Sequence, residues 1–377
     1  MQGIYANWIV HPTHVGPPSV AHVGPPQVQS SEHPLLALAL DEFSRQLVKD
    51  QGKYARIPID SSLGRQAPGG STQPHIPDNA TGEDLLQRYD PGIRRMLVLE
   101  QLFRLVEVST TAPTGVHFGT TIAAVKGNTA GALWTVTCPL HVEPSILAEE
   151  TKRVESANEF ANGPNRPKRH RTEQLAEIVV QADSAPAFLL AVVGATTTTH
   201  PYTVECLDTA AAMVSAQLHP IKHTLKAPRP VYRNARIAPL LQTPSHYSFP
   251  SGHATYAYCA AELLASLVGA NAPDPAALRE ALQRAAGLIA DNRVVAGLHY
   301  PADSDAGRGL GYALGRWLVA QGSAVDTGLL ASATYSVAKQ GANWQAVLAF
   351  GESANFKFAA TPRWRWLTYR AAQEWAQ

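Results

Sequence analysis

The stretch FPSGHATYAYCAAELLASLV, residues 249–268, joins a polar turn to an apolar run that is long enough for a helix. Pro250 ends the preceding segment, because proline fixes φ and removes a backbone donor. The small and apolar residues that follow predict a buried helix over 254–267. Ser251 and His253 then lie at the N-terminus of that helix, where free N–H groups and the positive end of the helix dipole attract an anion.

Two roles are open for this turn. Ser251 can serve simply as the N-cap of the helix, which is the structural interpretation. A cap does not explain a histidine in the first turn, and the unperturbed pKa of His253 lies near neutrality, as a general acid or base needs. Gly252, between them, allows the backbone to approach a bound group closely.

Similar apolar stretches, separated by proline and glycine, recur on both sides of this segment and predict a mainly helical chain. A helix begins at Pro91, where apolar residues recur at helical spacing. A candidate β-hairpin is formed by Thr120–Val125 and Ala132–Cys138 around a Lys-Gly-Asn turn. The further predicted helices are 172–193, 203–217, 254–267, 275–296, 304–320 and 328–348. The predicted fold class is all-α, a packed helical bundle with this one candidate hairpin.

Residues 1–90 have a different composition and predict an irregular N-terminal arm. The sequence HVGPP occurs twice there, and further prolines and glycines follow, which excludes a long helix or a central strand. An arm that wraps a neighbouring subunit of a homodimer is favoured over a metal site at His11, His14 and His22. The predicted domains are thus the arm, 1–90, and a helical catalytic domain, 91–377.

Composition sets limits on partners and compartment. The 377 residues carry a formal net charge of +1, so no overall field attracts nucleic acid or a membrane surface. Hydrophobic residues make up 45% and charged residues 16%, which suits a large buried interior. Cys138, Cys206 and Cys259 are scattered and lack zinc-site spacing, so they predict core thiols. We find no secretory signal and no uninterrupted apolar run of about 20 residues, which predicts a soluble, cytoplasmic protein.

A second polar cluster contains two fixed cations. Lys222 and Arg229 follow a predicted helix that ends near His219, and prolines on both sides of Arg229 stiffen the backbone around its guanidinium. A planar guanidinium matches the geometry of tetrahedral oxyanions. By itself this cluster has an ordinary structural explanation, since basic residues after a helix complement the negative end of its dipole.

The third cluster is a tight corner between two predicted helices. Gly297 ends one helix and Pro301 opens the next, with His299 between them and Arg293 a turn or two behind. Asp303 follows four residues after His299, within reach of one imidazole nitrogen if the corner is helical. A carboxylate there fixes the tautomer and makes the other nitrogen a better nucleophile or ligand. The alternative is a buried histidine that is satisfied by a neighbouring carboxylate.

Together the three clusters supply cations, helix-terminal N–H groups and two histidines, which are the parts needed to hold a tetrahedral or trigonal-bipyramidal oxyanion. Their spacing, Lys-x6-Arg-Pro, Pro-Ser-Gly-His and Arg-x5-His-x3-Asp, resembles that of the type 2 phosphatidic acid phosphatase and vanadium haloperoxidase superfamily. The matching residues are Lys222, Arg229, Pro230, Pro250, Ser251, Gly252, His253, Arg293, His299 and Asp303. One departure is Asn292, which stands where the family usually has serine.

The resemblance implies vanadate as the cofactor, with phosphate able to occupy the same site. His299 would be the axial ligand of vanadium or the nucleophile that attacks phosphate, and Asp303 would support its ring. His253 would be the acid/base, and Lys222 would polarise bound peroxide. The groups that would neutralise the equatorial oxygens are the side chains of Lys222, Arg229 and Arg293 and the backbone N–H groups of Ser251 and Gly252.

The two activities of this superfamily share one kind of site, so the surrounding residues must separate them. His246 lies five residues before Ser251. In the haloperoxidases this position resembles the one that carries histidine in bromide-oxidising members and phenylalanine in chloride-oxidising ones. A surface-loop histidine is the alternative. Neither the membrane-spanning helices nor the export signal of other branches is found in the sequence.

The predicted function is therefore a vanadate-dependent haloperoxidase that uses hydrogen peroxide to oxidise bromide or iodide and halogenates a small organic substrate. The first alternative is a soluble acid phosphatase that hydrolyses phosphomonoesters through a phosphohistidine. A non-catalytic phosphate-binding protein is the less favoured alternative, because both histidines that it would not need are present.

Overall fold

The computed structural model describes residues 83–376, except 115–116, 127–128, 137–143, 163–170, 324–327 and 341–342. Most of the predicted arm, including the two HVGPP copies and the three histidines considered for metal binding, lies outside the described residues. So does Cys138, whereas Cys206 and Cys259 are buried free thiols as predicted. The described chain begins with a short 3-10 helix, η1 (Glu83–Arg88). The domain boundary placed at residue 90 stays a prediction.

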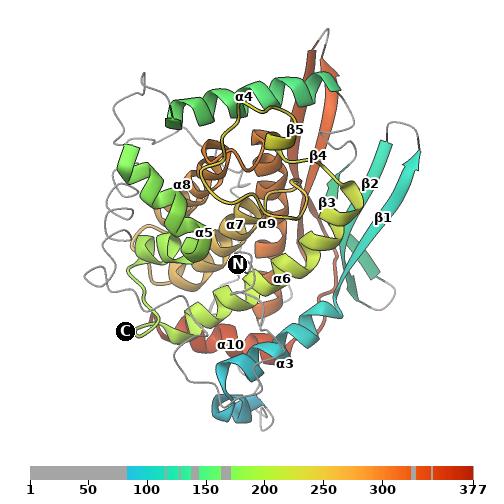
Figure 1. Ribbon diagram of the computed structural model, residues 1–377. Coiled ribbons are helices and arrows are strands. Elements are labelled where there is room, and N and C mark those ends of the chain that lie inside the picture. The colour runs from blue at the N-terminus through green and yellow to red at the C-terminus, as the bar shows by residue number, and fades with distance from the viewer. Residues whose placement is uncertain are drawn as a thin grey trace.

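Helices make up most of the described chain, which confirms the predicted mainly helical fold. They surround a central pair, α7 and α9, with α4 along one end and α3 and α10 at the other (Figure 1). The α-helices are α3 (Pro91–Phe103), α4 (Pro144–Asn162), α5 (Arg171–Val193), α6 (Pro201–Leu225), α7 (Gly252–Gly269), α8 (Pro275–Val295), α9 (Pro301–Gly322) and α10 (Pro362–Gln373). A short 3-10 helix, η3 (Pro230–Tyr232), follows Arg229.

The residues expected to break helices also start them. Pro91, Pro201, Pro275, Pro301 and Pro362 each occupy the first turn of a helix, where a missing N–H costs nothing. The loop residue before α8 adds a side-chain cap, since an Asp274 oxygen accepts from the N–H groups of two helix residues at 3.1 and 3.0 Å. These local signals explain why most predicted helix starts agree with the structure within a few residues.

Close packing of α7 against α9 sets the centre of the molecule. Gly307, Gly311 and Gly315 recur every four residues on the face of α9 that meets α7. A methyl group added at Gly311 would lie 2.3 Å from the carbonyl oxygen of Thr255 on α7, a distance that real side chains do not reach. The two backbones can therefore approach one another only because these positions lack side chains. The contact fixes the relation between the Pro-Ser-Gly-His turn and the His299 corner.

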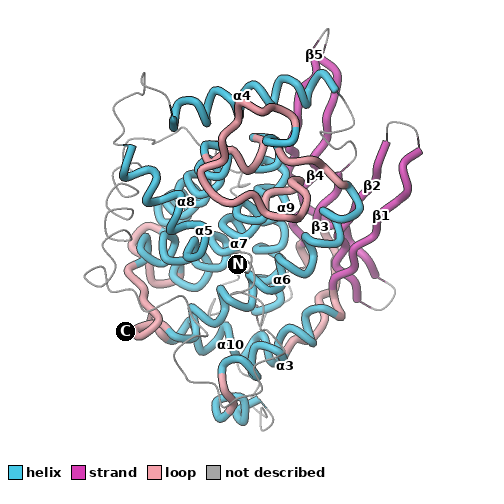
Figure 2. Tube along the Cα trace, viewed as in Figure 1, coloured by secondary structure: helices cyan, strands magenta, loops and turns pink. Residues whose placement is uncertain are grey.

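One five-stranded sheet covers a side of the helical core (Figure 2). The predicted hairpin is confirmed, since β2 pairs antiparallel with β3. In the strand order β1-β2-β3-β4-β5, the β3–β4 pair alone is parallel among the described strands, and it aligns Trp134 with Ala333. The strands are β1 (Val106–Thr114), β2 (His117–Lys126), β3 (Thr129–Val136), β4 (Leu330–Gln340) and β5 (Asn343–Ser353). The sheet packs on α9, where Ala333 lies close to Gly309.

The predicted helix over 328–348 is wrong, because this segment forms most of the β4–β5 hairpin. In β4 the buried residues Ala333, Tyr335 and Val337 alternate with the more exposed Thr334 and Ser336. That period of two is the pattern of a strand with one buried face. The alanines in the segment favour a helix by intrinsic propensity, and packing against α9 overrides that preference.

One described helix segment, Gln174–Val193 within α5, is long and apolar enough by length and composition to cross a membrane, which the sequence analysis did not anticipate. Of its most apolar window, 61% is buried inside the structure. Two polar residues of this segment, Glu177 and Gln181, are fully buried and accept hydrogen bonds from α8. The segment therefore forms part of the core around the candidate site.

Candidate anion-binding active site

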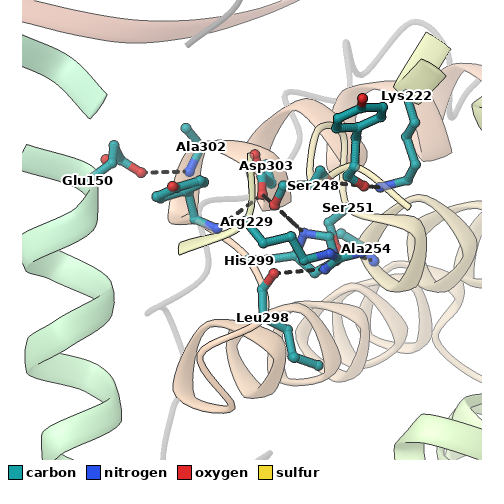
Figure 3. A network of polar contacts seen from close by, with 12 residues as sticks. Glu150, Lys222, Arg229, Ser248, Ser251, Ala254, Leu298, His299, Ala302 and Asp303 are labelled. Carbon is teal, nitrogen blue, oxygen red and sulfur yellow. Dashed lines mark hydrogen bonds and ion pairs between the residues drawn. The ribbon is translucent and has the colours of Figure 1, made fainter. Parts of the chain in front are cut away.

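Three breaks between helices, α6–η3, η3–α7 and α8–α9, supply the predicted site residues. Figure 3 shows five of them, Lys222, Arg229, Ser251, His299 and Asp303. Lys222 lies in the last turn of α6, which ends at Leu225 and not near residue 219, so this lysine belongs to the helix and does not follow it. Arg229 precedes η3, and Arg293 lies in the last turn of α8. The corner from α8 to α9 supplies His299.

The His299 ring is held on both sides. Its Nδ1 lies 3.0 Å from Oδ2 of Asp303 and 3.3 Å from Oγ of Ser248, and its Nε2 lies 3.3 Å from Nη1 of Arg229. A carboxylate only accepts and a guanidinium only donates, so Nδ1 carries the proton and Nε2 carries the lone pair. Burial, with Arg229 and Lys222 nearby, lowers the pKa of His299 well below its ordinary value. The ring is therefore neutral, with a nucleophilic nitrogen beside a cation.

Asp303 orients this ring from the first turn of α9. Its Oδ2 also accepts from the N–H of Tyr300 at 3.0 Å and from the hydroxyl of Ser248. Burial raises the pKa of Asp303 to about 6, against the opposing effects of the Ser248 hydrogen bond and of Lys222. The carboxylate is thus ionised at neutral pH and becomes protonated under mildly acidic conditions. Asp303 lies in the first turn of α9, whereas His299 and Tyr300 precede the helix, so the predicted contact forms although the corner itself is not helical.

Lys222 and Arg229 are buried cations held largely by neutral acceptors. Nζ of Lys222 donates to the carbonyl oxygens of Tyr247 and Ser248, at 3.0 and 2.7 Å. Arg229 donates to the carbonyl oxygens of His246 and Leu298, at 3.0 and 2.8 Å. Both residues are 1% exposed, and burial, then the charge of Arg229, lower the pKa of Lys222 well below its ordinary value. Because buried charge is costly unless it is compensated, this arrangement favours a bound anion.

Arg293 and His253 lie on the side of the site that faces α5. Nη2 of Arg293 donates to the carbonyl oxygen of Ile178 at 2.8 Å and to Oε1 of Gln181 at 3.2 Å. Nε2 of His253 lies 3.2 Å from the carbonyl oxygen of Gln181. Burial, then the charges of Arg293 and Arg229, lower the pKa of His253 well below its ordinary value. His253 in turn affects the pKa of His299, so the two predicted catalytic histidines lie within electrostatic reach.

The turn before α7 acts both as a cap and as a link. Oγ of Ser251 accepts from the N–H of Ala254 at 3.4 Å, and the N–H of Ser251 donates to the carbonyl oxygen of Asp303 at 2.9 Å. The expectation that this N–H faces a bound anion is therefore wrong, because it fastens α7 to α9. Gly252 is the first residue of α7, where helix geometry leaves the N–H without an intrahelical acceptor.

His246 packs against the cation that faces His299. Its Nδ1 lies 3.1 Å from Nη2 of Arg229, and its ring meets that of His219 edge-on at 5.1 Å between centroids. Burial, Lys222 and Arg229 lower the pKa of His246 to about 3, so its ring is neutral. His246 is half-buried in the loop between η3 and α7, so its role at the site stays a prediction.

Comparison of the sequence with known protein families finds a match over the part of the chain that contains this site. Residues 205–325 match the family model of the PAP2 superfamily. This segment of the chain is similar to that superfamily. Its members are generally enzymes, and they include phosphatases and haloperoxidases. No curated protein matches the chain. The PAP2 segment contains every predicted site residue from Lys222 to Asp303, whereas α5 and the sheet lie outside it.

The departure from the family pattern within the PAP2 segment joins a buried polar network. Nδ2 of Asn292 donates to Oε2 of Glu177 at 2.7 Å and to Oε1 of Gln181 at 3.0 Å. Nε2 of Gln174 lies 3.4 Å from Oδ1 of the same asparagine. The shorter side chain of serine has one hydroxyl in place of this amide, so it could not make all of these contacts.

Sequence analysis missed two residues that touch the predicted catalytic histidines. Ser248 contacts both Asp303 and His299, and Gln181 contacts both His253 and Arg293. Neither belongs to the spacing pattern of the family. The available signal for Gln181 is a polar side chain within a strongly apolar helix, which indicates a buried hydrogen-bonding role.

Proposed function

We propose that the protein is a vanadate-dependent haloperoxidase that uses hydrogen peroxide to oxidise bromide or iodide and so halogenates organic substrates. The observation that carries the choice between the superfamily's activities is the contact of His246 with Arg229. Because a guanidinium only donates, Nδ1 of this second neutral imidazole accepts from Arg229, and its Nε2–H is a donor suited to an oxygen of hydrogen peroxide. A phosphatase has no evident use for that additional group.

The residues of the site fit vanadate. Nε2 of His299 supplies the lone pair for the central atom, and the side chains of Lys222, Arg229 and Arg293 supply positive charge for the oxygens. The N–H of Gly252 adds a donor from the α7 terminus. When bound, vanadate acts as a Lewis acid that activates hydrogen peroxide without changing its own oxidation state.

His253 moves protons in the proposed reaction. When its Nε2–H donates to the Gln181 carbonyl oxygen, Nδ1 carries the lone pair and accepts a proton from the incoming peroxide. Lys222 draws electron density from the oxygens at the site, which favours attack by a halide. Asp303 keeps His299 in the tautomer that presents Nε2 to the anion.

Bromination of a phenol dye tests this proposal. The purified full chain is incubated with orthovanadate, hydrogen peroxide and bromide, and the expected result is turnover that depends on vanadate. No turnover above a vanadate-free control would overturn the proposal. A His246→Phe variant should oxidise bromide more slowly than the wild type. If its rate is unchanged, the contact of His246 no longer supports a haloperoxidase over a phosphatase.

The second candidate is a phosphatase that works through a phosphohistidine, favoured by the pairing of His299 with Asp303. A neutral histidine oriented by a carboxylate is a suitable nucleophile toward phosphorus. Hydrolysis of p-nitrophenyl phosphate by vanadate-free protein tests this candidate, and vanadate should then inhibit. Phosphate binding without either activity would instead support a non-catalytic phosphate-binding protein.

We also propose that the enzyme is soluble and cytoplasmic, with α5 as a core helix. The support is the burial of Glu177 and Gln181, whose side chains accept hydrogen bonds from α8. Cell fractionation in the absence of detergent should place the protein in the supernatant. Recovery in the membrane fraction would contradict this assignment.

A further inference from the structure

Gln181 on α5 meets the proposed anion site from outside the PAP2 segment. Its side chain is fully buried, and its Oε1 accepts from Nδ2 of Asn292 at 3.0 Å and from Nη2 of Arg293 at 3.2 Å. Its backbone carbonyl oxygen accepts from Nε2 of His253. One residue thus contacts both the cation and the acid/base of this side of the site.

The orientation of the Gln181 amide is fixed by its neighbours. A guanidinium has donors only, so the amide atom that faces Arg293 must be oxygen. Asn292 reinforces this choice, because its Nδ2 also donates to the Glu177 carboxylate and must therefore be nitrogen. The amide nitrogen of Gln181 consequently points away from these two donors.

Among the described residues, Nε2 of Gln181 has no hydrogen-bond partner, although it is buried. A buried amide N–H without an acceptor is costly, so such an atom calls for a ligand. Arg293 donates to Oε1 of the same amide, and its positive charge attracts an oxyanion. An anionic oxygen drawn to this guanidinium is an acceptor whose charge suits Nε2.

We propose that Gln181 binds the oxyanion by donating a hydrogen bond from Nε2 to one of its oxygens, and that Asn292 is the positioning residue that fixes the amide for this purpose. This inference rests on the proposed anion site. It gives Asn292 a purpose where the family usually has serine, since the longer amide reaches Gln181. It also adds an uncharged donor from α5 to the cations supplied by the PAP2 segment.

Calorimetric titration of the full chain with inorganic phosphate tests the inference without requiring turnover. Gln181→Met keeps the length of the side chain and removes the donor, so phosphate should bind about tenfold to about hundredfold more weakly. Gln283→Met is the matched control, because it removes a buried amide that donates to Oε1 of Glu262 and lies outside the Asn292 network. That variant should retain the wild-type dissociation constant within about twofold.

A double-mutant cycle tests the positioning role of Asn292. Asn292→Ser alone should weaken phosphate binding, but it should add little to the loss already caused by Gln181→Met. Independent, additive losses would show that Asn292 does not act through Gln181. Unfolding transitions of all variants are compared, so that a loss of fold is recognised.

A crystal structure of the wild-type protein with phosphate keeps the inference testable even if Gln181→Met fails to fold. Nε2 of Gln181 should lie within hydrogen-bonding distance of a phosphate oxygen, and a separation beyond about 4 Å would overturn the inference. If the wild type binds neither phosphate nor vanadate, the proposed function fails as well. If the wild type binds phosphate and Gln181→Met binds it equally well, only the role of Gln181 is overturned.

Discussion

The two sides of the candidate site are built differently. The side of the proposed nucleophile, called the nucleophile side, consists of Ser248, His299 and Asp303, all within the PAP2 segment, and their side chains contact one another directly. The side of the proposed acid/base consists of His253 and Arg293, which the neighbouring helix α5 holds through Gln181. The family pattern therefore identifies the charged groups on both sides, but it identifies the residues that orient them mainly on the first.

Replacing the proposed nucleophile gives the largest expected effect. His299→Ala removes the one nitrogen suited to bond the central atom, so turnover should fall by about a thousandfold or more in whichever assay is positive. His223→Ala, on an exposed residue of α6, is the matched control and should keep full activity. Substantial turnover by His299→Ala would remove the basis for assigning a nucleophile side.

Replacing the proposed acid/base, His253, should impair proton transfer much more than anion binding. His253→Ala should lower turnover by about a hundredfold to a thousandfold, because general acid–base catalysis contributes on that scale. Its affinity for sulfate, measured by calorimetry, should change only a few-fold, since the side chain is neutral in the folded protein. Equal losses of turnover and affinity would mean that His253 acts in binding, and the two sides would no longer differ in role.

The pH dependence of activity reports on Asp303. Its pKa of about 6 exceeds the value of 3.8 for an unperturbed aspartate, so the folded chain binds this proton more tightly than the unfolded chain. The contribution of Asp303 to the free energy of unfolding therefore decreases as the pH rises from about 4 to about 6. Activity should instead rise over this pH range, because only the ionised carboxylate accepts a hydrogen bond from the Nδ1–H of His299.

Ser248→Ala should move this acidic limb to higher pH. The hydroxyl donates to the Asp303 carboxylate and lowers its pKa, so its loss raises that pKa further. Turnover at pH 6 should fall by about threefold to tenfold, with a smaller loss at pH 8. A pH–rate profile checks the prediction, and an unshifted acidic limb would exclude Asp303 as the group that titrates.

The smallest expected effect on the chemistry comes from the packing that joins both sides. Gly311→Ala places a methyl group against the Thr255 carbonyl oxygen, so the free energy of unfolding should fall by about 1–3 kcal/mol. Gly269→Ala, at the end of α7, meets its nearest atom at an ordinary 3.9 Å and serves as the control. Chemical denaturation measures both, and equal stability of the two variants would contradict the close approach of α7 and α9.

Sequence patterns predicted the helices near the site because each begins or ends at a strong local signal. Pro275 and Pro301 open α8 and α9, and the apolar run after His253 forms α7. The β4–β5 hairpin was not predicted, because its alanines suit a helix equally well and its alternating burial depends on α9. Local propensity does not contain that tertiary contact.

The charged site residues were predictable, because the spacing of the lysine, arginines and histidines in the sequence resembles the superfamily pattern. The contacts of Ser248 and Gln181 were not predictable, because serine and glutamine occur widely without a special role. Gln181 is also far in sequence from His253 and Arg293, and only the packing of α5 against α7 and α8 brings it near. The sequence predicts that the N–H of Ser251 faces the anion, because it does not show that the carbonyl oxygen of Asp303, on another helix, accepts from this N–H.

The parallel pairing of β3 with β4 has a consequence for the order of folding. The two strands lie on either side of α4 to α9 in the chain, so their ladder closes a loop that contains the whole active site. Contacts between such distant segments form slowly, and β3 must leave one edge open until β4 has been synthesised. A newly made chain that ends before Leu330 would therefore expose a strand edge suited to pairing with other chains, even though every catalytic side chain has already been made.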